Sequence, residues 1–166
     1  MYRATTALRK LVKAGKFLEL PTAHDALTGK LIQSIGFKSL YVGGFVTGGS
    51  TTISEPQLTM TEQIGLASNI ANGLKIPVVM DAGAGWGEPL HTMRTIRECI
   101  RAGIAGVHIE DQLFPKRAHY HTYVAHNIPI NEYRDKIKLA CAQRDQTDKD
   151  FVIIARSDAC LEQGYK

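Results

Sequence analysis

The sequence predicts an α/β protein built on a parallel β-sheet. Short runs of β-branched and apolar residues alternate with longer segments of helical period, which is the pattern of repeated βα units. Runs such as Val78-Val79-Met80 are almost continuously apolar, so both faces of the sheet should be covered. Polar residues follow several of these runs. These observations favour a helix-wrapped barrel or a doubly wound sheet.

Five strands are expected, near residues 18–21, 39–43, 77–82, 106–110 and 151–156. Helices are expected near residues 5–16, 25–35, 61–73, 90–102 and 131–144. A complete barrel of this type has about eight strands and ~250 residues. Residues 1–166 would therefore form the N-terminal portion of a single barrel domain, with about the first five βα units.

Composition excludes several classes of protein. The chain is 44% hydrophobic, and 20 basic residues against 16 acidic ones give a net charge of +4, without a basic stripe for nucleic acid. No apolar run is long enough for a membrane span, and the N-terminus is better explained as an amphipathic helix than as a signal peptide. The cysteines form no CxxC pair, which fits the reducing cytoplasm and predicts neither a zinc site nor a disulfide framework.

Two acids end separate predicted strands in equivalent positions. Asp81 ends the third predicted strand and Glu110 ends the fourth, so their carboxylates could meet at the mouth of a barrel. Carboxylate oxygens are ligands that Mg²⁺ prefers. The alternative is that each acid caps a helix or pairs with a lysine. Two acids at matching strand ends favour the magnesium site.

Two further features also lie at the ends of predicted strands, and so at the same mouth of the barrel. Gly43-Gly44, followed by Gly48-Gly49, could bring backbone N–H groups close to an anionic ligand, or could form only a tight turn after a strand. Arg156 ends a buried apolar strand and needs a carboxylate partner, from a substrate or from Glu110.

Residues 116–126 read KRAHYHTYVAH, a polar segment too long for a tight βα connection. It could be a lid that supplies an acid or base, a solvated loop, or a transition-metal site at His119 and His121. Tyr41 and Trp86 could flank the mouth or merely pack. His108, inside a strand, is interpreted as a satisfied core histidine.

Four ordered segments resemble the motifs of the isocitrate lyase and phosphoenolpyruvate mutase superfamily. They are YVGG from Tyr41, DAGAGWG from Asp81, GVHIEDQLFPKR from Gly106 and FVIIARSDA from Phe151. The resemblance implies a TIM-type (β/α)8 barrel, usually a homotetramer that exchanges its eighth helix between subunits. It also implies Mg²⁺, a small carboxylic acid substrate and an enolate-like intermediate.

The resemblance also assigns roles to residues. Asp81 and Glu110 would belong to the Mg²⁺ cluster, and Arg156 would hold a substrate carboxylate. Backbone donors to the substrate would come from Gly43, Gly44 and Phe45. Tyr41 would stand near the hydroxyl that loses its proton, and Lys116 with the following segment would match the mobile gate.

Three positions depart from the family pattern. Gly83 replaces the second acid of the usual Asp-Ala-Asp, which puts metal affinity in doubt, and Gly43 replaces a serine. Ala118 stands where lyases of the family carry the cysteine that protonates the departing carbanion, so His119, Tyr120 or His121 would have to replace it.

The leading hypothesis is a Mg²⁺-dependent carbon–carbon lyase of the methylisocitrate lyase type, acting on a small 2-hydroxy or 2-oxo di- or tricarboxylic acid. Isocitrate itself is not the expected substrate. Oxaloacetate decarboxylation or hydrolysis, or phosphonopyruvate or phosphoenolpyruvate mutase chemistry, would tolerate Ala118 better. A truncated non-catalytic chain and a simple binding module are the alternatives outside catalysis.

Overall fold

A computed structural model describes residues 2–117 and 126–160. One sheet of four parallel strands follows the order β1-β2-β3-β4, with bounds Leu40–Val42, Val78–Asp81, Gly106–Glu110 and Val152–Arg156. The predicted α/β class with a parallel sheet is confirmed. Because the order is strictly consecutive, the sheet has the topology of a barrel segment and lacks the order reversal of a doubly wound sheet.

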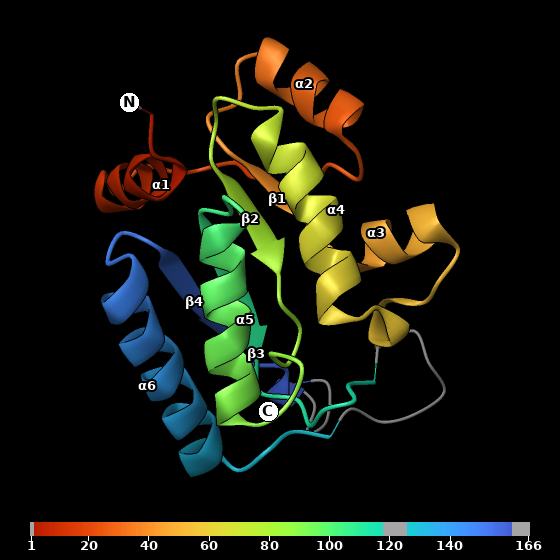
Figure 1. Ribbon diagram of the computed structural model, residues 1–166, viewed down its shortest axis with the longest axis vertical. Helices are drawn as coiled ribbons and strands as arrows, with labels where there is room; N and C mark the ends of the chain where they lie inside the picture. Colours follow the sequence, from red (N-terminus) through yellow and green to blue (C-terminus); the bar gives the residue numbers. More distant parts are fainter. Residues whose placement is uncertain (1, 118–125, 161–166) are drawn as a thin grey trace.

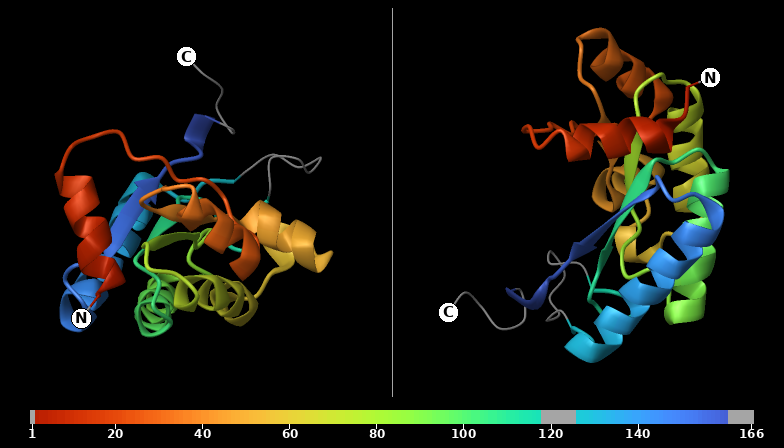
Figure 2. Two further views of the ribbon diagram at one scale, coloured as in Figure 1. Left: turned by 90° about the horizontal axis from the view of Figure 1, so that it is seen from above. Right: turned by 90° about the vertical axis from the view of Figure 1, so that its left-hand side faces the viewer.

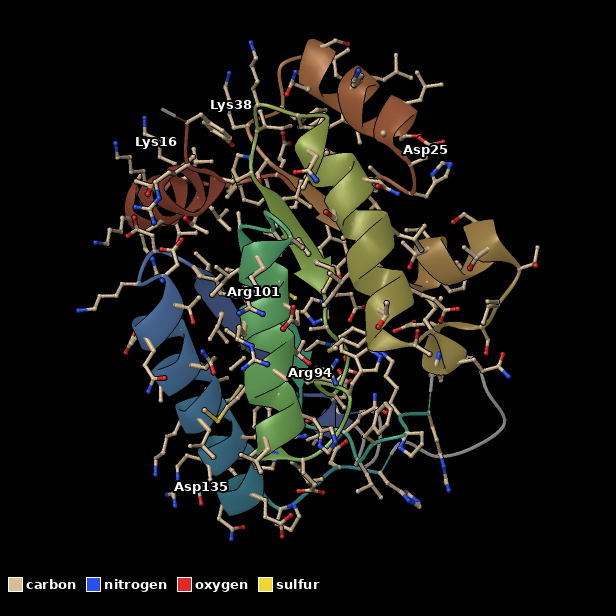
Figure 3. The ribbon with its side chains drawn as sticks, in the orientation of Figure 1. Lys16, Asp25, Lys38, Arg94, Arg101 and Asp135 are labelled. Atoms are coloured by element: carbon tan, nitrogen blue, oxygen red, sulfur yellow. The ribbon has the colours of Figure 1, made fainter. Side chains whose placement is uncertain are left out.

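The helices are α1 (Ala4–Lys13), α2 (Ala26–Ser34), α3 (Gly44–Thr51), the 3₁₀ helix η1 (Glu55–Gln57), α4 (Met60–Asn72), α5 (Pro89–Arg101) and α6 (Ile130–Thr147). Figures 1 and 2 show α4, α5 and α6 along one face of the sheet, and α1 near the end where the strands begin. Charged side chains such as Arg94, Arg101 and Asp135 project outward from α5 and α6 (Figure 3).

Successive strand residues face opposite sides, so each strand supplies two cores. Val78 and Met80 of β2 join the large core under the helices. Val79 lies between these two residues in the strand and faces the opposite side, where it joins a small cluster with Leu8 of α1 and Val152 of β4. That inner face continues toward the strand ends, where polar side chains replace apolar ones.

The prediction of a regular strand at residues 18–21 is wrong. The chain there makes only an isolated parallel bridge, Thr22 to Tyr41, supported by hydrogen bonds from Tyr41 N to Pro21 O (2.9 Å) and from Ala23 N to Tyr41 O (2.9 Å). The segment lies beside β1, but Pro21 has no N–H to extend the ladder.

The interpretation of residues 43–49 as a Gly-rich turn is also incomplete, because Gly44–Thr51 forms helix α3. Glycine disfavours helices, so local propensity gave no sign of this one. Packing accounts for part of it: a Cβ on Gly48 would lie 2.6 Å from the Ile53 carbonyl oxygen. The chain after α3 can therefore fold back closely against it and bring Glu55 to the edge of the sheet.

Candidate active site

The site lies on the inner face of the sheet, where the strands end. Strand register places Asp81 beside His108 and Glu110 beside Arg156. His108 and Glu110 share a face because they are two residues apart in β3. The structure therefore brings together the acids and the arginine predicted from the sequence.

Asp81 is a buried carboxylate held by backbone groups. Its Oδ1 accepts a hydrogen bond from Gly83 N (2.8 Å), and its Oδ2 accepts one from Gly44 N (3.3 Å). Burial opposes ionisation of Asp81, but His108, Lys116 and these two N–H groups outweigh it and lower the pKa of the carboxyl. Asp81 is therefore an anion at neutral pH.

Glu110 is fully buried at the end of β3. Lys116 Nζ lies 2.8 Å from its Oε1, and Arg156 Nη1 lies 3.3 Å from its Oε2. Among the described residues, however, neither oxygen receives a hydrogen bond of good geometry. Burial raises the pKa of Glu110 to about 7, because it outweighs the attraction of Lys116 and Arg156. Buried oxygens with unused lone pairs are suited to receive a further cation.

Lys116, assigned to the site from the resemblance, lies inside it. Its ammonium forms close ion pairs with both Glu110 and Glu55. Glu55 was missed by the sequence analysis because it follows no strand. One signal was available: Glu55 is the only acidic residue between Asp25 and Glu62.

Tyr41 and His108 form a second pair within the site. Their rings stack with centroids 5.5 Å apart, and the Tyr41 hydroxyl makes a short hydrogen bond to His108 Nε2. Burial lowers the pKa of His108, against the opposing effect of Asp81, and burial and then Asp81 raise the pKa of Tyr41. Both shifts favour the neutral forms of the imidazole and the phenol.

The interpretation of His108 as a satisfied core histidine is wrong in two respects. Its Nδ1 is buried and has no hydrogen-bond partner among the described residues. Its Nε2 lies 3.5 Å from Asp81 Oδ1, inside the polar cluster. The sequence did contain a sign of this: His108 lies two residues before Glu110 in the same strand, so the two side chains face the same side of the sheet.

Arg156 is fixed by acids on the protein. Its Nε and Nη2 donate to Asp158 Oδ1 and Oδ2 at 2.7 and 3.1 Å, and Asp158 Oδ2 also accepts from Gln112 Nε2 at 2.6 Å. The sequence left two alternatives for Arg156, ligand clamp or partner of Glu110. The second is present, and 40% exposure of the side chain leaves access for a ligand.

A cavity of about 240 Å³ lies within the site, and Tyr41, Glu55, Asp81, Lys116 and Arg156 are among the residues that line it. Gly43, Gly44 and Phe45 also line it, where helix α3 begins. The N–H of Gly44 already donates to Asp81, so this donor of the expected cradle has a partner within the protein. His119 and His121 lie outside the described residues.

The donor set fits a hard divalent cation. Asp81, His108 and Glu110 each offer a ligand atom within 4.8 Å of the others, in the part of the chain that the structure describes. The Glu55 carboxylate joins them through Lys116. Mg²⁺ takes one or two carboxylates together with waters and substrate oxygens. Asp81 and Glu110 supply such oxygens, and those of Glu110 have no other hydrogen bond among the described residues.

Comparison with known proteins gives a consistent result. The family model for phosphoenolpyruvate phosphomutase matches residues 8–166. The chain is 36% identical over 160 residues to 2,3-dimethylmalate lyase of Eubacterium barkeri, which covers 95% of this chain and 54% of that protein. It is 35% identical over 162 residues to probable 2-methylisocitrate lyase 2 of Corynebacterium glutamicum, with 95% and 51% covered.

Among solved structures, a phosphonopyruvate hydrolase complexed with oxalate and Mg²⁺ superposes with a TM-score of 0.88 at 27% identity. The match covers 98% of this chain and 55% of that one. The chain thus spans about half the length of the relatives it matches. Within the described residues, no helix has the length and apolar character needed to cross a membrane.

Proposed function

We propose that this chain, which belongs to the phosphoenolpyruvate phosphomutase family, is the N-terminal portion of a TIM-barrel enzyme that cleaves a carbon–carbon bond in a small 2-hydroxy or 2-oxo di- or tricarboxylic acid with Mg²⁺. The observation that carries the proposal is the meeting of Asp81, Glu110 and Glu55 with two cationic side chains at the strand ends. The lyase activity of the relatives supports the choice of reaction.

Asp81 and Glu110 would hold the magnesium ion. Asp81 stays ionised at neutral pH because its pKa is lowered, and the two oxygens of Glu110 pair with the cationic side chains of Lys116 and Arg156. When bound, Mg²⁺ would supply positive charge opposite the oxygens of an enolate-like product.

The remaining side chains would bind and orient the substrate. Arg156 would face a substrate carboxylate across the cavity, with its guanidinium plane fixed by Asp158. The Tyr41 hydroxyl would take the proton from a substrate hydroxyl while passing its own proton to His108 Nε2, to which it is hydrogen-bonded.

An alternative within the same site is hydrolysis or decarboxylation of oxaloacetate, or phosphonopyruvate or phosphoenolpyruvate mutase chemistry. Ala118 cannot protonate a departing carbanion, and this favours a reaction that needs no such acid. The structural similarity to a phosphonopyruvate hydrolase bound to oxalate and Mg²⁺ supports the same alternative.

We expect the full-length protein to be a homo-oligomer, of which a tetramer is the form implied by the family. Leu27, Leu31 and Ile35 form one stripe along α2 and are 68%, 59% and 73% exposed. Exposed apolar stripes of this kind mark contacts between proteins. Size-exclusion chromatography of the full-length protein with light scattering measures the assembly.

The test is a substrate panel with and without Mg²⁺, using 2-methylisocitrate, 2,3-dimethylmalate, oxaloacetate and phosphonopyruvate, with loss of the substrate and identification of its products by NMR as the readout. Turnover of a hydroxy acid supports the lyase, and turnover of oxaloacetate or phosphonopyruvate alone supports the alternative. If no acid is turned over, calorimetric titration of Mg²⁺ with oxalate separates two cases. Binding lost in Asp81→Ala indicates an assembled but non-catalytic site, and absence of binding refutes the magnesium site.

A further inference from the structure

Lys136 of α6 is a buried lysine that the proposed function does not use. It is 4% exposed, and its ammonium donates a hydrogen bond to the Ala84 carbonyl oxygen at 3.1 Å. Burial lowers the pKa of Lys136 against the attraction of Glu88, Glu110 and Glu132, none of which forms an ion pair with it in the described part of the chain. Burying an ammonium without a carboxylate partner costs free energy, so stability of the fold does not account for this contact.

Ala84 belongs to the segment between β2 and α5, whose backbone contacts both acids of the site. The Gly83 N–H donates to Asp81 Oδ1 at 2.8 Å, and the Gly83 carbonyl accepts from Glu110 N at 2.9 Å. Gly83 therefore joins the two acids through its own backbone groups. Lys136 holds the carbonyl of the next residue, and so fixes the peptide units that set the spacing of these acids.

This segment is strained and is held by several side chains. Trp86 has a φ of 56°, in the left-handed region that residues other than glycine rarely adopt. Such conformations persist where the surrounding contacts fix them. Thr95 Oγ1 donates to the Gly85 carbonyl at 3.1 Å, and Trp86 Nε1 donates to the Leu58 carbonyl at 3.0 Å. Lys136 adds a contact from α6 to this set.

Tyr133 makes similar contacts with the other two strand ends. Its hydroxyl lies 2.7 Å from the Ile109 carbonyl oxygen and 2.9 Å from that of Arg156, so its proton is shared between the two. Ile109 directly precedes Glu110. Residues 133 and 136 are three positions apart and share one face of the helix. That face of α6 therefore contacts the backbone at the ends of β3 and β4 and just after β2.

We propose that Tyr133 and Lys136 are positioning residues of the metal site. By holding the backbone at three strand ends, they set the spacing of the two acids and the arginine, and thereby the affinity for Mg²⁺ and an anionic ligand. Neither residue lines the cavity of about 240 Å³, so both act through the backbone. The inference rests on the proposed function, because it takes Asp81 and Glu110 as the metal ligands.

The first experiment is calorimetric titration of Mg²⁺, and then of oxalate with Mg²⁺ present, into the full-length wild type, Lys136→Met and Tyr133→Phe. Removing a group that orients metal ligands typically lowers metal affinity by about 10- to 100-fold, and we expect a loss of about tenfold in each variant. Tyr133→Phe retains the ring that packs against the core, so its test does not depend on the folding of Lys136→Met. Wild-type affinity in either folded variant would overturn the role of that residue.

Two controls separate positioning from a general loss of structure. Lys138→Met removes an exposed lysine of α6 that pairs with Asp135 at 3.1 Å, and should leave binding unchanged. Lys136→Arg keeps a cationic donor, and the cavity of about 550 Å³ that Lys136 borders has room for the larger group. This variant should recover most of the affinity. Affinity as low in Lys136→Arg as in Lys136→Met would contradict the role of the hydrogen bond.

The second experiment is hydrogen–deuterium exchange without metal, followed by peptide mass spectrometry. Loss of the contact with Ala84 predicts faster exchange in residues 82–87 of Lys136→Met and an unchanged rate in α1. Equal exchange of residues 82–87 in the wild type and Lys136→Met would overturn the inference.

The two failures are distinguishable. Absence of Mg²⁺ binding by the wild type contradicts the proposed magnesium site, whereas the exchange measurement tests the contact of Lys136 without any metal. Binding of Mg²⁺ by the wild type that neither variant weakens contradicts only the present inference.

Discussion

The two ends of the inner sheet face are built from the same strands but differ in chemistry. At the end where the strands begin, Leu8 packs against Val79 and Val152, and the polar groups above them are paired: Thr5 donates to Asp148 (2.8 Å) and Arg9 to the Phe151 carbonyl (2.7 Å). At the other end, charged groups crowd a cavity, and Glu110 and the Nδ1 of His108 lack hydrogen bonds among the described residues. One end thus consists of paired groups that stabilise the fold, and the other has the charged groups and the cavity expected of a binding site at the strand ends.

Leu8→Ala tests the stabilising end and should have the largest effect. Leu8 is 1% exposed, so its truncation leaves a cavity and should lower the free energy of unfolding by about 2–5 kcal/mol. Denaturant unfolding measures the loss. Val12→Ala, on the same helix and 49% exposed, should change stability by less than about 0.5 kcal/mol. Equal losses in both variants would contradict the assignment of Leu8 to the core.

The pH dependence of stability tests the binding end. The pKa of Glu110 is raised from 4.5 to about 7, so folding favours its protonated form. Its contribution is full below pH 4.5 and is lost as pH rises through 7, at a cost of roughly 3 kcal/mol. Urea unfolding of the wild type and Glu110→Gln across this range should show stability of the wild type falling relative to the variant. Parallel curves would mean that Glu110 ionises normally.

Asp81→Asn should separate function from stability. The amide keeps an oxygen that accepts from Gly83 N but loses the negative charge, so Mg²⁺-dependent turnover should fall by about 100-fold. The melting temperature measured without metal should fall by only a few degrees, because one of the two backbone N–H groups loses its acceptor oxygen. Turnover close to that of the wild type would exclude Asp81 as a metal ligand.

Thr5→Ala should give the smallest effect. It removes the hydrogen bond to Asp148 and should cost about 1 kcal/mol of stability, measured by urea unfolding, without changing metal affinity. Thr5→Ser retains the hydroxyl and should recover most of the loss. A change in metal affinity in Thr5→Ala would show that the two ends of the sheet are coupled.

Strand ends were the most predictable part of the site. A parallel sheet places the carboxyl ends of its strands at one edge, so Asp81, Glu110 and Arg156 could be grouped from the apolar runs before them. Side chains alternate between the two faces of a strand, so His108 could have been grouped with them as well. It lies in register with Asp81. The interpretation of His108 as a core residue was wrong because it did not consider His108 together with Glu110 on the same face of the strand.

The sequence by itself determined the parallel α/β sheet, the order of its elements and the family, because apolar period and local motifs carry that information. Only the tertiary structure decided that Gly44–Thr51 is a helix, that residues 18–21 are not a regular strand, and that Glu55 meets Lys116. These features depend on contacts between segments, such as the close approach of Gly48 to Ile53, which outweigh local propensity. The ion pair between Lys116 and Glu110 is likewise decided by the tertiary structure, because only folding brings these two side chains together.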